Sequence, residues 1–331
     1  MNNTTHHQAT QTRFLPNLLV RHRHVQTVLL TLHRAGPTNV QQAAREMILE
    51  TAAGVRLQGF YSPQPEQSKG LILLLHGWLG CATSNYNLIL SEHLYRQGYA
   101  IFRINYRDHG DTHHLNPGVF RGDLLDEMFD ATRQIAQLEP DRPFYVTGAS
   151  LGGSFALRIA WRHAQTPIPN LVHTLAVNPA INPHSATLAL DRNPLYLHYF
   201  RSRWQKSLKI KQTLFPDMYD FTPELAAKSC MEMTEILMPR YSPYPDAITY
   251  FQHYQVTPAM MAALTGPVTI LTAADDPIVP VEDFHDFVDV SDHLQLDIQP
   301  CGGHVGFVDI FPFRYWVTEY VDKVLGQYKG V

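Results

Sequence analysis

The sequence predicts an α/β fold with a mostly parallel, twisted sheet that is flanked by helices. Short apolar runs alternate along the chain with longer amphipathic stretches, and this alternation is typical of βαβ units. The run LILLL at 71–75 has no polar residue at alternate positions, which indicates a strand covered by helices on both faces. With 331 residues, the chain is long enough for one large α/β domain that carries an insertion.

The elements are expected in a regular order after a distinct N-terminal region. Residues 1–45 form an arm, in which residues 1–12 are polar and disordered and the remainder is helical. Two β-like runs at 47–61, separated by Ala-Ala-Gly, indicate a hairpin. The strands that follow are expected at 70–77, 99–107, 143–150, 171–178, 267–275 and 293–300. Helices are expected at 85–97, 120–138, 151–163, 281–288 and 311–328.

One segment interrupts this alternation. Residues 183–258 contain no clear strand, many prolines and a cluster of aromatic side chains, and they lie between the sixth and seventh predicted strands. We therefore predict a cap insertion, packed over the carboxyl edge of the sheet. The core is then formed by residues 46–182 and 259–331.

Composition excludes several classes of protein. A net charge of −4 argues against a nucleic-acid binder that relies on a positive field. The three cysteines, Cys81, Cys230 and Cys301, have no metal-ligand spacing and cannot all pair, which is typical of a reducing compartment. The N-terminus has no basic segment followed by an apolar run, and no apolar run is long enough to span a membrane. The expected location is cytoplasmic.

The segment VTGASLGGSF at 146–155 contains a G-x-S-x-G pattern centred on Ser150. A strand is predicted directly before it and a helix directly after it, as in a turn that exposes a nucleophilic serine. The pattern alone occurs by chance in about one chain in ten of this length. An ordinary serine in a glycine-rich turn is therefore the alternative. Candidate partner residues elsewhere in the chain are needed to choose between the two interpretations.

A nucleophilic serine needs an imidazole base and a carboxylate that orients it. His304 follows a predicted strand in the turn CGGH, and Asp276 and Asp275 follow another in VTILTAADDPIVP. We favour Asp276 because Pro277 fixes the backbone just after it, with Asp275 as the alternative. The resulting order, serine then aspartate then histidine, is the one that this type of turn requires.

The same chemistry needs backbone N–H groups that stabilise a developing alkoxide. One donor is expected from the residue after the nucleophile, Leu151. The second is expected from the loop after an early strand, HGWLG at 76–80, where we assign the Trp78 amide.

The segments HGWLG, GASLGG, DDPIVP and GGHVGF, in this order over most of 71–328, resemble the α/β-hydrolase fold family. The opening FLPNLLVRHRHVQTVL is similar to the YheT-like branch of esterases, where a phenylalanine, a proline and an HxQT-type stretch recur. Ser84, Asn85 and Tyr86, which follow the HGWLG loop, fit the same branch. The resemblance implies a hydrolase of ester-like bonds with Ser150, Asp276 and His304 as its catalytic triad.

Four further features allow both a functional and a structural interpretation. The acidic and histidine-rich loop at 108–114 could ligate a metal, but its spacing is not diagnostic, and a structural role in the loop or a place at the pocket rim is favoured. The basic stretch at 192–211 could contact anionic lipid or an acidic substrate, although a solvated cap helix is favoured. His76 is expected to order the HGWLG loop, and Cys301 to be a small buried residue rather than a regulatory thiol. The loop and stretch comprise Asp108, His109, Asp111, His113, His114, Arg192, Arg201, Arg203, Lys206, Lys209 and Lys211.

The sequence therefore predicts a serine hydrolase that cleaves a small-molecule carboxylic ester through an acyl-enzyme, with no cofactor and no metal. The aromatic-rich insertion favours an apolar acyl group of medium size or a lipid-like one. An acyltransferase, thioesterase or peptidase on the same triad stays open, as does a receptor that binds a ligand without turnover. Neither a nucleic-acid partner nor an integral membrane span is expected. Peripheral membrane contact through the basic stretch stays open.

Overall fold

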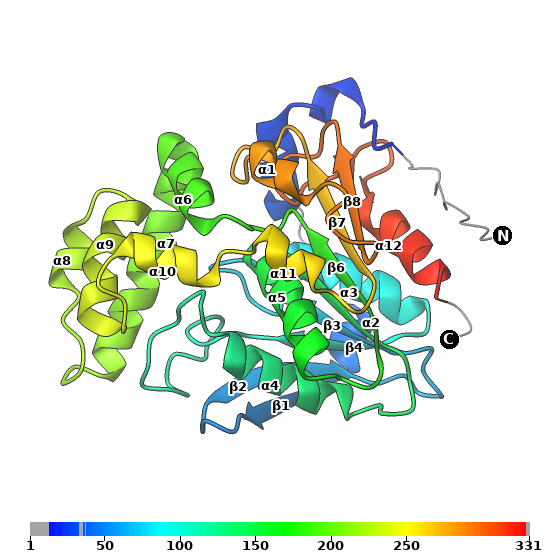
Figure 1. The fold of residues 1–331 in the computed structure, drawn as a ribbon, viewed down its shortest axis with the longest axis horizontal. Coiled ribbons are helices and arrows are strands. Elements are labelled where there is room, and N and C mark those ends of the chain that lie inside the picture. The colour runs from blue at the N-terminus through cyan, green and yellow to red at the C-terminus, as the bar shows by residue number, and fades with distance from the viewer. Residues whose placement is uncertain (1–12, 33–35, 37, 329–331) are drawn as a thin grey trace.

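The computed structural model describes residues 13–32, 36 and 38–328, so the disorder predicted for 1–12 lies outside the described residues. Eight strands form one sheet in the order β1-β2-β4-β3-β5-β6-β7-β8 (Figure 1). The first two form the predicted antiparallel hairpin, and β2 also pairs antiparallel with β4. All other neighbours are parallel. The strands are β1 (Arg45–Glu50), β2 (Arg56–Ser62), β3 (Leu71–Leu75), β4 (Ala100–Ile104), β5 (Phe144–Ala149), β6 (Leu171–Val177), β7 (Val268–Ala273) and β8 (Leu294–Gln299).

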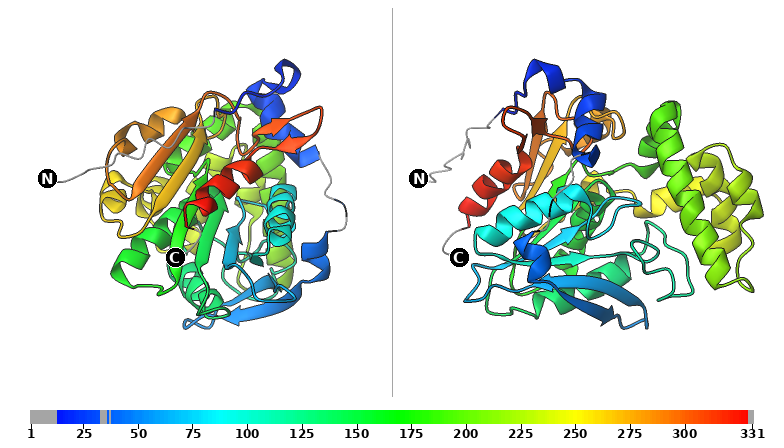
Figure 2. Two further views of the ribbon diagram at one scale, coloured as in Figure 1. Left: turned by 90° about the vertical axis from the view of Figure 1, so that its right-hand side faces the viewer. Right: turned by 180° about the vertical axis from the view of Figure 1, so that it is seen from behind.

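The apolar strand β3 lies between two layers of helices. Leu71, Leu73 and Leu75 belong to the buried core under α4 and α5, whereas Ile72 and Leu74 belong to the core under α1, α3 and α12. The expected burial on both faces therefore follows from alternate side chains that point to opposite sides. Figure 2 shows α3 and α12 on one face, where they contact each other. The helices are α1 (Arg23–Leu32), α3 (Asn85–Arg96), α4 (Leu125–Ala136), α5 (Leu151–Gln165) and α12 (Val317–Gly326).

Two helices begin later than predicted. Before α4, the Phe120 N–H donates to Asp108 and the Gly122 N–H donates to the Tyr250 hydroxyl, so long-range contacts hold these residues in a loop. Before α12, β9 (Val308–Asp309) pairs with β10 (Arg314–Tyr315) as a short ribbon. Before α4 the apolar pattern extends past the helix because the loop residues 120–124 are partly buried. Before α12 the side chains of Phe311 and Phe313 are exposed, and the buried side chains begin at Tyr315 and Trp316. Short elements complete the core: η1 (Leu18–Val20), α2 (Asn39–Gln42), α11 (Pro258–Ala262) and the 3₁₀ helix η2 (Val281–Phe287).

The segment between β6 and β7 folds into helices that lie together beside the sheet (Figure 1). Asn182 and Asn193 cap two of them, each followed by a proline in the first turn, where its missing N–H costs nothing. The helices are α6 (Pro183–Arg192), α7 (Pro194–Leu214), α8 (Thr222–Ala226), α9 (Cys230–Tyr241) and α10 (Ala247–Tyr254). Their arrangement supports the division into core and cap, which stays a prediction. Among the described helices, none combines the length and the apolar character needed to cross a membrane.

Candidate active site

Ser150 stands on a sharp turn between β5 and α5. Its backbone adopts φ +55° and ψ −120°, a region that costs about 1–3 kcal/mol for a residue other than glycine. The turn is held because the Ser150 N–H donates to Val177 O at 2.9 Å. A Cβ on Gly152 would lie 2.2 Å from Leu75 O, so only glycine lets α5 approach β3 this closely. The expected glycine-rich turn is therefore present, with the Ser150 side chain at the carboxyl end of the strand.

The structure brings the three predicted side chains together. His304 Nε2 lies 2.8 Å from Ser150 Oγ, and His304 Nδ1 lies 2.8 Å from Asp276 Oδ2. The Asp276 side chain is fully buried, and that of His304 is 9% exposed. The order is therefore hydroxyl, imidazole and buried carboxylate, in which Nδ1 donates its proton to the carboxylate and Nε2 is free to accept one.

Asp276, and not Asp275, contacts His304. Asp276 Oδ1 accepts hydrogen bonds from the N–H groups of Ile278 (2.8 Å) and Val279 (3.0 Å), which fix the carboxylate plane. Asp275 Oδ1 instead accepts from the Gly303 N–H at 2.9 Å. Burial raises the pKa of the Asp275 carboxyl, and the Gly303 N–H opposes the rise. Asp276 thus binds the imidazole of His304, whereas Asp275 binds the backbone of the loop that carries it.

Asn178 is a site residue that the sequence analysis missed. Its Nδ2 donates to Asp276 Oδ2 at 2.7 Å and to Gly303 O at 3.2 Å, and its Oδ1 accepts from the Val305 N–H at 3.3 Å. It therefore ties the carboxylate to the histidine loop. The available signal was a polar residue directly after β6, the strand beside β5, because the carboxyl ends of parallel strands meet at one edge.

The loop after β3 lies beside Ser150, since a Cβ on Gly77 would lie 3.3 Å from Ser150 Cβ. Three amides of this loop have partners: Gly77 N–H donates to the Tyr86 hydroxyl, Leu79 N–H to His109 Nε2, and Gly80 N–H to Gly77 O. Within the described residues, neither the Trp78 amide nor that of Leu151, at the start of α5, has such a partner. These two amides are thus available to a ligand at Ser150.

Two buried histidines support the same loop. His76 Nδ1 donates to Gly77 O at 2.8 Å, and His109 Nδ1 donates to Arg107 O at 2.7 Å, which leaves His109 Nε2 to accept from the Leu79 N–H. Burial lowers the pKa of His76 to about 4 and holds that of His109 well below its ordinary value. Both rings are therefore neutral, as their hydrogen-bonding roles require. His76 orders the loop as expected.

Comparison with known proteins places this arrangement in a family. The family model described as alpha/beta hydrolase fold matches residues 70–309. The chain belongs to the α/β-hydrolase fold family. A protein of Synechocystis sp. (strain ATCC 27184 / PCC 6803 / Kazusa), named "Putative esterase slr0264", is 23% identical over 286 residues, which cover 79% of this chain and 76% of that protein.

Solved structures share the fold at lower identity. The Pyrococcus furiosus esterase Pf2001 superposes with a TM-score of 0.62 at 15% identity, covering 90% of this chain and 96% of that one. The serine hydrolase CCSP0084 of Cycloclasticus zankles gives 0.53 at 14% identity, covering 86% and 96%. At such identities these similarities establish the α/β-hydrolase fold. The distant relatives of this α/β-hydrolase are esterases and hydrolases.

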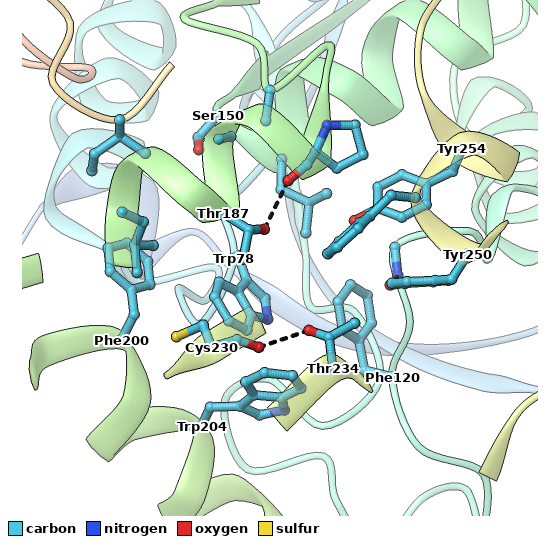
Figure 3. Close-up of a pocket in the computed structure, with 18 of the residues that line it drawn as sticks. Trp78, Phe120, Ser150, Thr187, Phe200, Trp204, Cys230, Thr234, Tyr250 and Tyr254 are labelled. Carbon is cyan, nitrogen blue, oxygen red and sulfur yellow. Dashed lines mark hydrogen bonds between the residues drawn. The ribbon is translucent and has the colours of Figure 1, made fainter. Parts of the chain in front are cut away.

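A cavity lies between the α/β-hydrolase sheet and the helices α6, α7, α9 and α10 (Figure 3), with an empty volume of about 830 Å³, its open mouth included. Ser150 lies at one end and Trp204 at the other (Figure 3). Trp78 stacks on Phe200, with ring centroids 5.6 Å apart, and meets Trp204 edge-on. None of the residues that line the cavity is charged. The polar side chains Thr187 and Thr234 donate to backbone carbonyls of their own helices.

The loop at 108–114 joins this α/β-hydrolase core to α7. Asp108 accepts from Lys211 Nζ at 2.8 Å, and Lys211 also donates to the His113 and Asn116 carbonyls. No group of three His, Cys, Asp or Glu in the described part of the chain is placed to hold a metal. The interpretation of 192–211 as a solvated helix is wrong for Lys211, whose side chain is 1% exposed. The charge is tolerated there because one carboxylate and two carbonyls surround it.

Lys211→Met is expected to lower the free energy of unfolding by about 3–5 kcal/mol, because it leaves the Asp108 carboxylate buried without its cation. Urea denaturation at neutral pH measures this loss. Lys209→Met, on the exposed side of the same helix, is the matched control and should change stability by less than about 0.5 kcal/mol. Equal effects of the two substitutions would contradict a structural role for the Lys211–Asp108 pair.

Proposed function

We propose that this α/β-hydrolase cleaves carboxylic esters through an acyl-enzyme formed on Ser150. The observation that carries the proposal is the relay in which His304 lies 2.8 Å from both Ser150 Oγ and Asp276 Oδ2. A serine hydroxyl is a weak nucleophile until a neighbouring base takes its proton. In this relay Nε2 is the base, and the buried carboxylate of Asp276 stabilises the imidazolium that forms.

The reaction proceeds in two steps. Ser150 Oγ attacks the ester carbonyl as its proton moves to His304 Nε2, and the tetrahedral intermediate collapses when that proton passes to the leaving alcohol. Water then enters, gives a proton to His304 and attacks the acyl carbon, and the proton returns to Ser150 as the acid leaves. Each step needs one base and one acid in turn, and His304 provides both.

The developing negative charge on the carbonyl oxygen is stabilised by the Trp78 and Leu151 amides. Their proximity to Ser150 and the engagement of the Gly77, Leu79 and Gly80 amides elsewhere support this assignment. Amides of this kind are effective because they are already oriented and lie in a site that excludes water.

The substrate class follows from the cavity next to Ser150. Its lining is aromatic and aliphatic and holds no charged residue, so a charged group would lose its hydration without gaining an ionic partner. We therefore assign it to an uncharged, apolar part of a small ester, such as a medium-sized acyl group. The names of the Synechocystis and Pyrococcus relatives and the resemblance of the opening segment to the YheT-like esterases support the same class of bond.

A fluorophosphonate probe tests this function without knowledge of the natural substrate. We expect the folded protein to gain one phosphonyl group, mapped to Ser150 by mass spectrometry, and an excess of an uncharged apolar ester to slow the labelling. Ser150→Ala should remain unlabelled. Absence of serine-dependent labelling on folded wild-type protein would exclude a serine hydrolase and favour a ligand receptor.

A further inference from the structure

The N-terminal helix α1 packs directly against the loop that carries His304. A Cβ on Gly303 would lie 2.5 Å from Arg23 O, and one on Gly306 would lie 2.5 Å from Gln26 O. Backbone of the arm thus meets backbone of the GGHVGF loop with no space for a side chain. The contact joins segments about 280 residues apart, as the Gln26–Val308 separation of 282 residues shows.

Gln26 fixes α1 to this loop. It is fully buried, and its Oε1 accepts from the Val308 N–H at 2.8 Å. Its Nε2 donates to Val308 O at 2.8 Å and to Val20 O at 2.7 Å. One side chain therefore pairs with both backbone groups of Val308, as a neighbouring strand would, and ties them to Val20 in η1.

Thr27, the next residue, contacts the backbone of His304. Its Oγ1 donates to Arg23 O at 2.8 Å and accepts from the His304 N–H at 2.9 Å. The hydroxyl is therefore oriented by its own helix and presents a lone pair to the His304 backbone. No other described residue accepts from the His304 N–H.

The loop around His304 needs such support from outside. Gly303, Val305 and Phe307 all have positive φ, at +56°, +58° and +46°. Non-glycine residues keep such conformations only where surrounding contacts impose them. The core holds Gly303 and Val305 through Asp275 and Asn178, and the arm supplies the contacts to His304 and Val308.

We propose that Gln26 and Thr27 of the N-terminal arm are positioning residues for His304, holding its loop so that the imidazole spans Ser150 and Asp276. The proposal rests on the proposed function. It also gives a role to the HVQT stretch at 24–27, which contains none of the proposed catalytic residues. The arm also reaches the cap, because His24 Nδ1 lies 2.7 Å from the Tyr196 hydroxyl on α7.

Thr27→Val tests the proposal, since it keeps the shape of the side chain and removes the acceptor. Rates on a p-nitrophenyl ester are divided by the number of active sites that react with fluorophosphonate. We expect kcat per active site to fall about tenfold with KM changed less than about twofold, because a displaced base slows proton transfer without altering the cavity. Thr27→Ser, which keeps the hydroxyl, should have a kcat per active site within about twofold of the wild-type value. Gln26→Leu should lower kcat in the same way and also lower Tm.

Thr213→Val is the matched control. Thr213 lies on the exposed side of α7, and its Oγ1 likewise donates to the carbonyl four residues before it, that of Lys209. It should leave kcat unchanged. The proposal is overturned if Thr27→Val keeps the wild-type kcat per active site. It is also overturned if kcat falls as much in Thr27→Ser, or in Thr213→Val, as it does in Thr27→Val.

The proposed function and this inference fail differently. Wild-type protein that does not react with fluorophosphonate would overturn both. Wild-type protein that reacts, beside a Thr27→Val variant that reacts at the same rate, would overturn the positioning role alone. The low-field Nδ1 proton resonance of His304 gives a readout that needs no substrate, and it should weaken in Thr27→Val while persisting in Thr27→Ser.

Discussion

Ser150→Ala is expected to lower kcat for ester hydrolysis by about 10⁶-fold, because among the described residues no other hydroxyl hydrogen-bonds to His304 Nε2. The substitution removes one oxygen atom and leaves a methyl group on the same turn. The cavity and the Trp78 and Leu151 amides should be unaffected. Substrate should therefore still bind, with KM within a few-fold of the wild-type value. Initial rates on a p-nitrophenyl ester measure the loss.

Ser154→Ala is the matched control for this loss. Ser154 lies in the same VTGASLGGSF segment, and its buried Oγ has no hydrogen-bond partner among the described residues. Removal of this hydroxyl should leave kcat for ester hydrolysis within about twofold of the wild-type value. Combining Ser150→Ala with His304→Ala should cost no more than Ser150→Ala alone, because the two residues act as one unit. Residual activity of a few per cent in Ser150→Ala would identify a different nucleophile.

The parts of the molecule that could be predicted from the sequence are those that local patterns determine. The apolar runs located the strands, since burial on both faces leaves no polar position in LILLL. The G-x-S-x-G pattern predicted the tight turn, since Gly152 is required by the approach of α5 to β3. Ser150, Asp276 and His304 each follow a strand, so their meeting at one edge was an inference from topology.

The parts that could not be predicted depend on contacts between distant segments. Lys211 belongs to a stretch whose charge predicts exposure to solvent. Its burial is tolerable because Asp108, 103 residues earlier, and the His113 and Asn116 carbonyls accept its hydrogen bonds. Asn178 resembles an ordinary residue at the end of a strand until the loop at 302–305 folds over it. The HVQT stretch was singled out by resemblance alone, and its contact with His304 spans 277 residues.

Asp276→Asn is expected to lower kcat by about 10⁴-fold while leaving the fold intact. The amide has nearly the same shape as the carboxylate, but it carries no charge to stabilise the imidazolium. Its NH₂ group, facing His304, would also favour the tautomer that holds its proton on Nε2, and that tautomer cannot accept a proton from Ser150. Initial rates per active site measure the loss, and Tm measures the fold.

Asp275→Asn is the matched control, one residue away in the same loop. Its amide oxygen can still accept the hydrogen bond from the Gly303 N–H, which Asp275 Oδ1 accepts at 2.9 Å. Burial raises the pKa of the Asp275 carboxyl, so a neutral amide also removes an unfavourable buried charge. We expect kcat within about threefold of wild type. The reverse result, a large loss from Asp275→Asn and a small one from Asp276→Asn, would mean that the histidine loop moves during turnover. The base would then use the carboxylate that holds Gly303 in this structure.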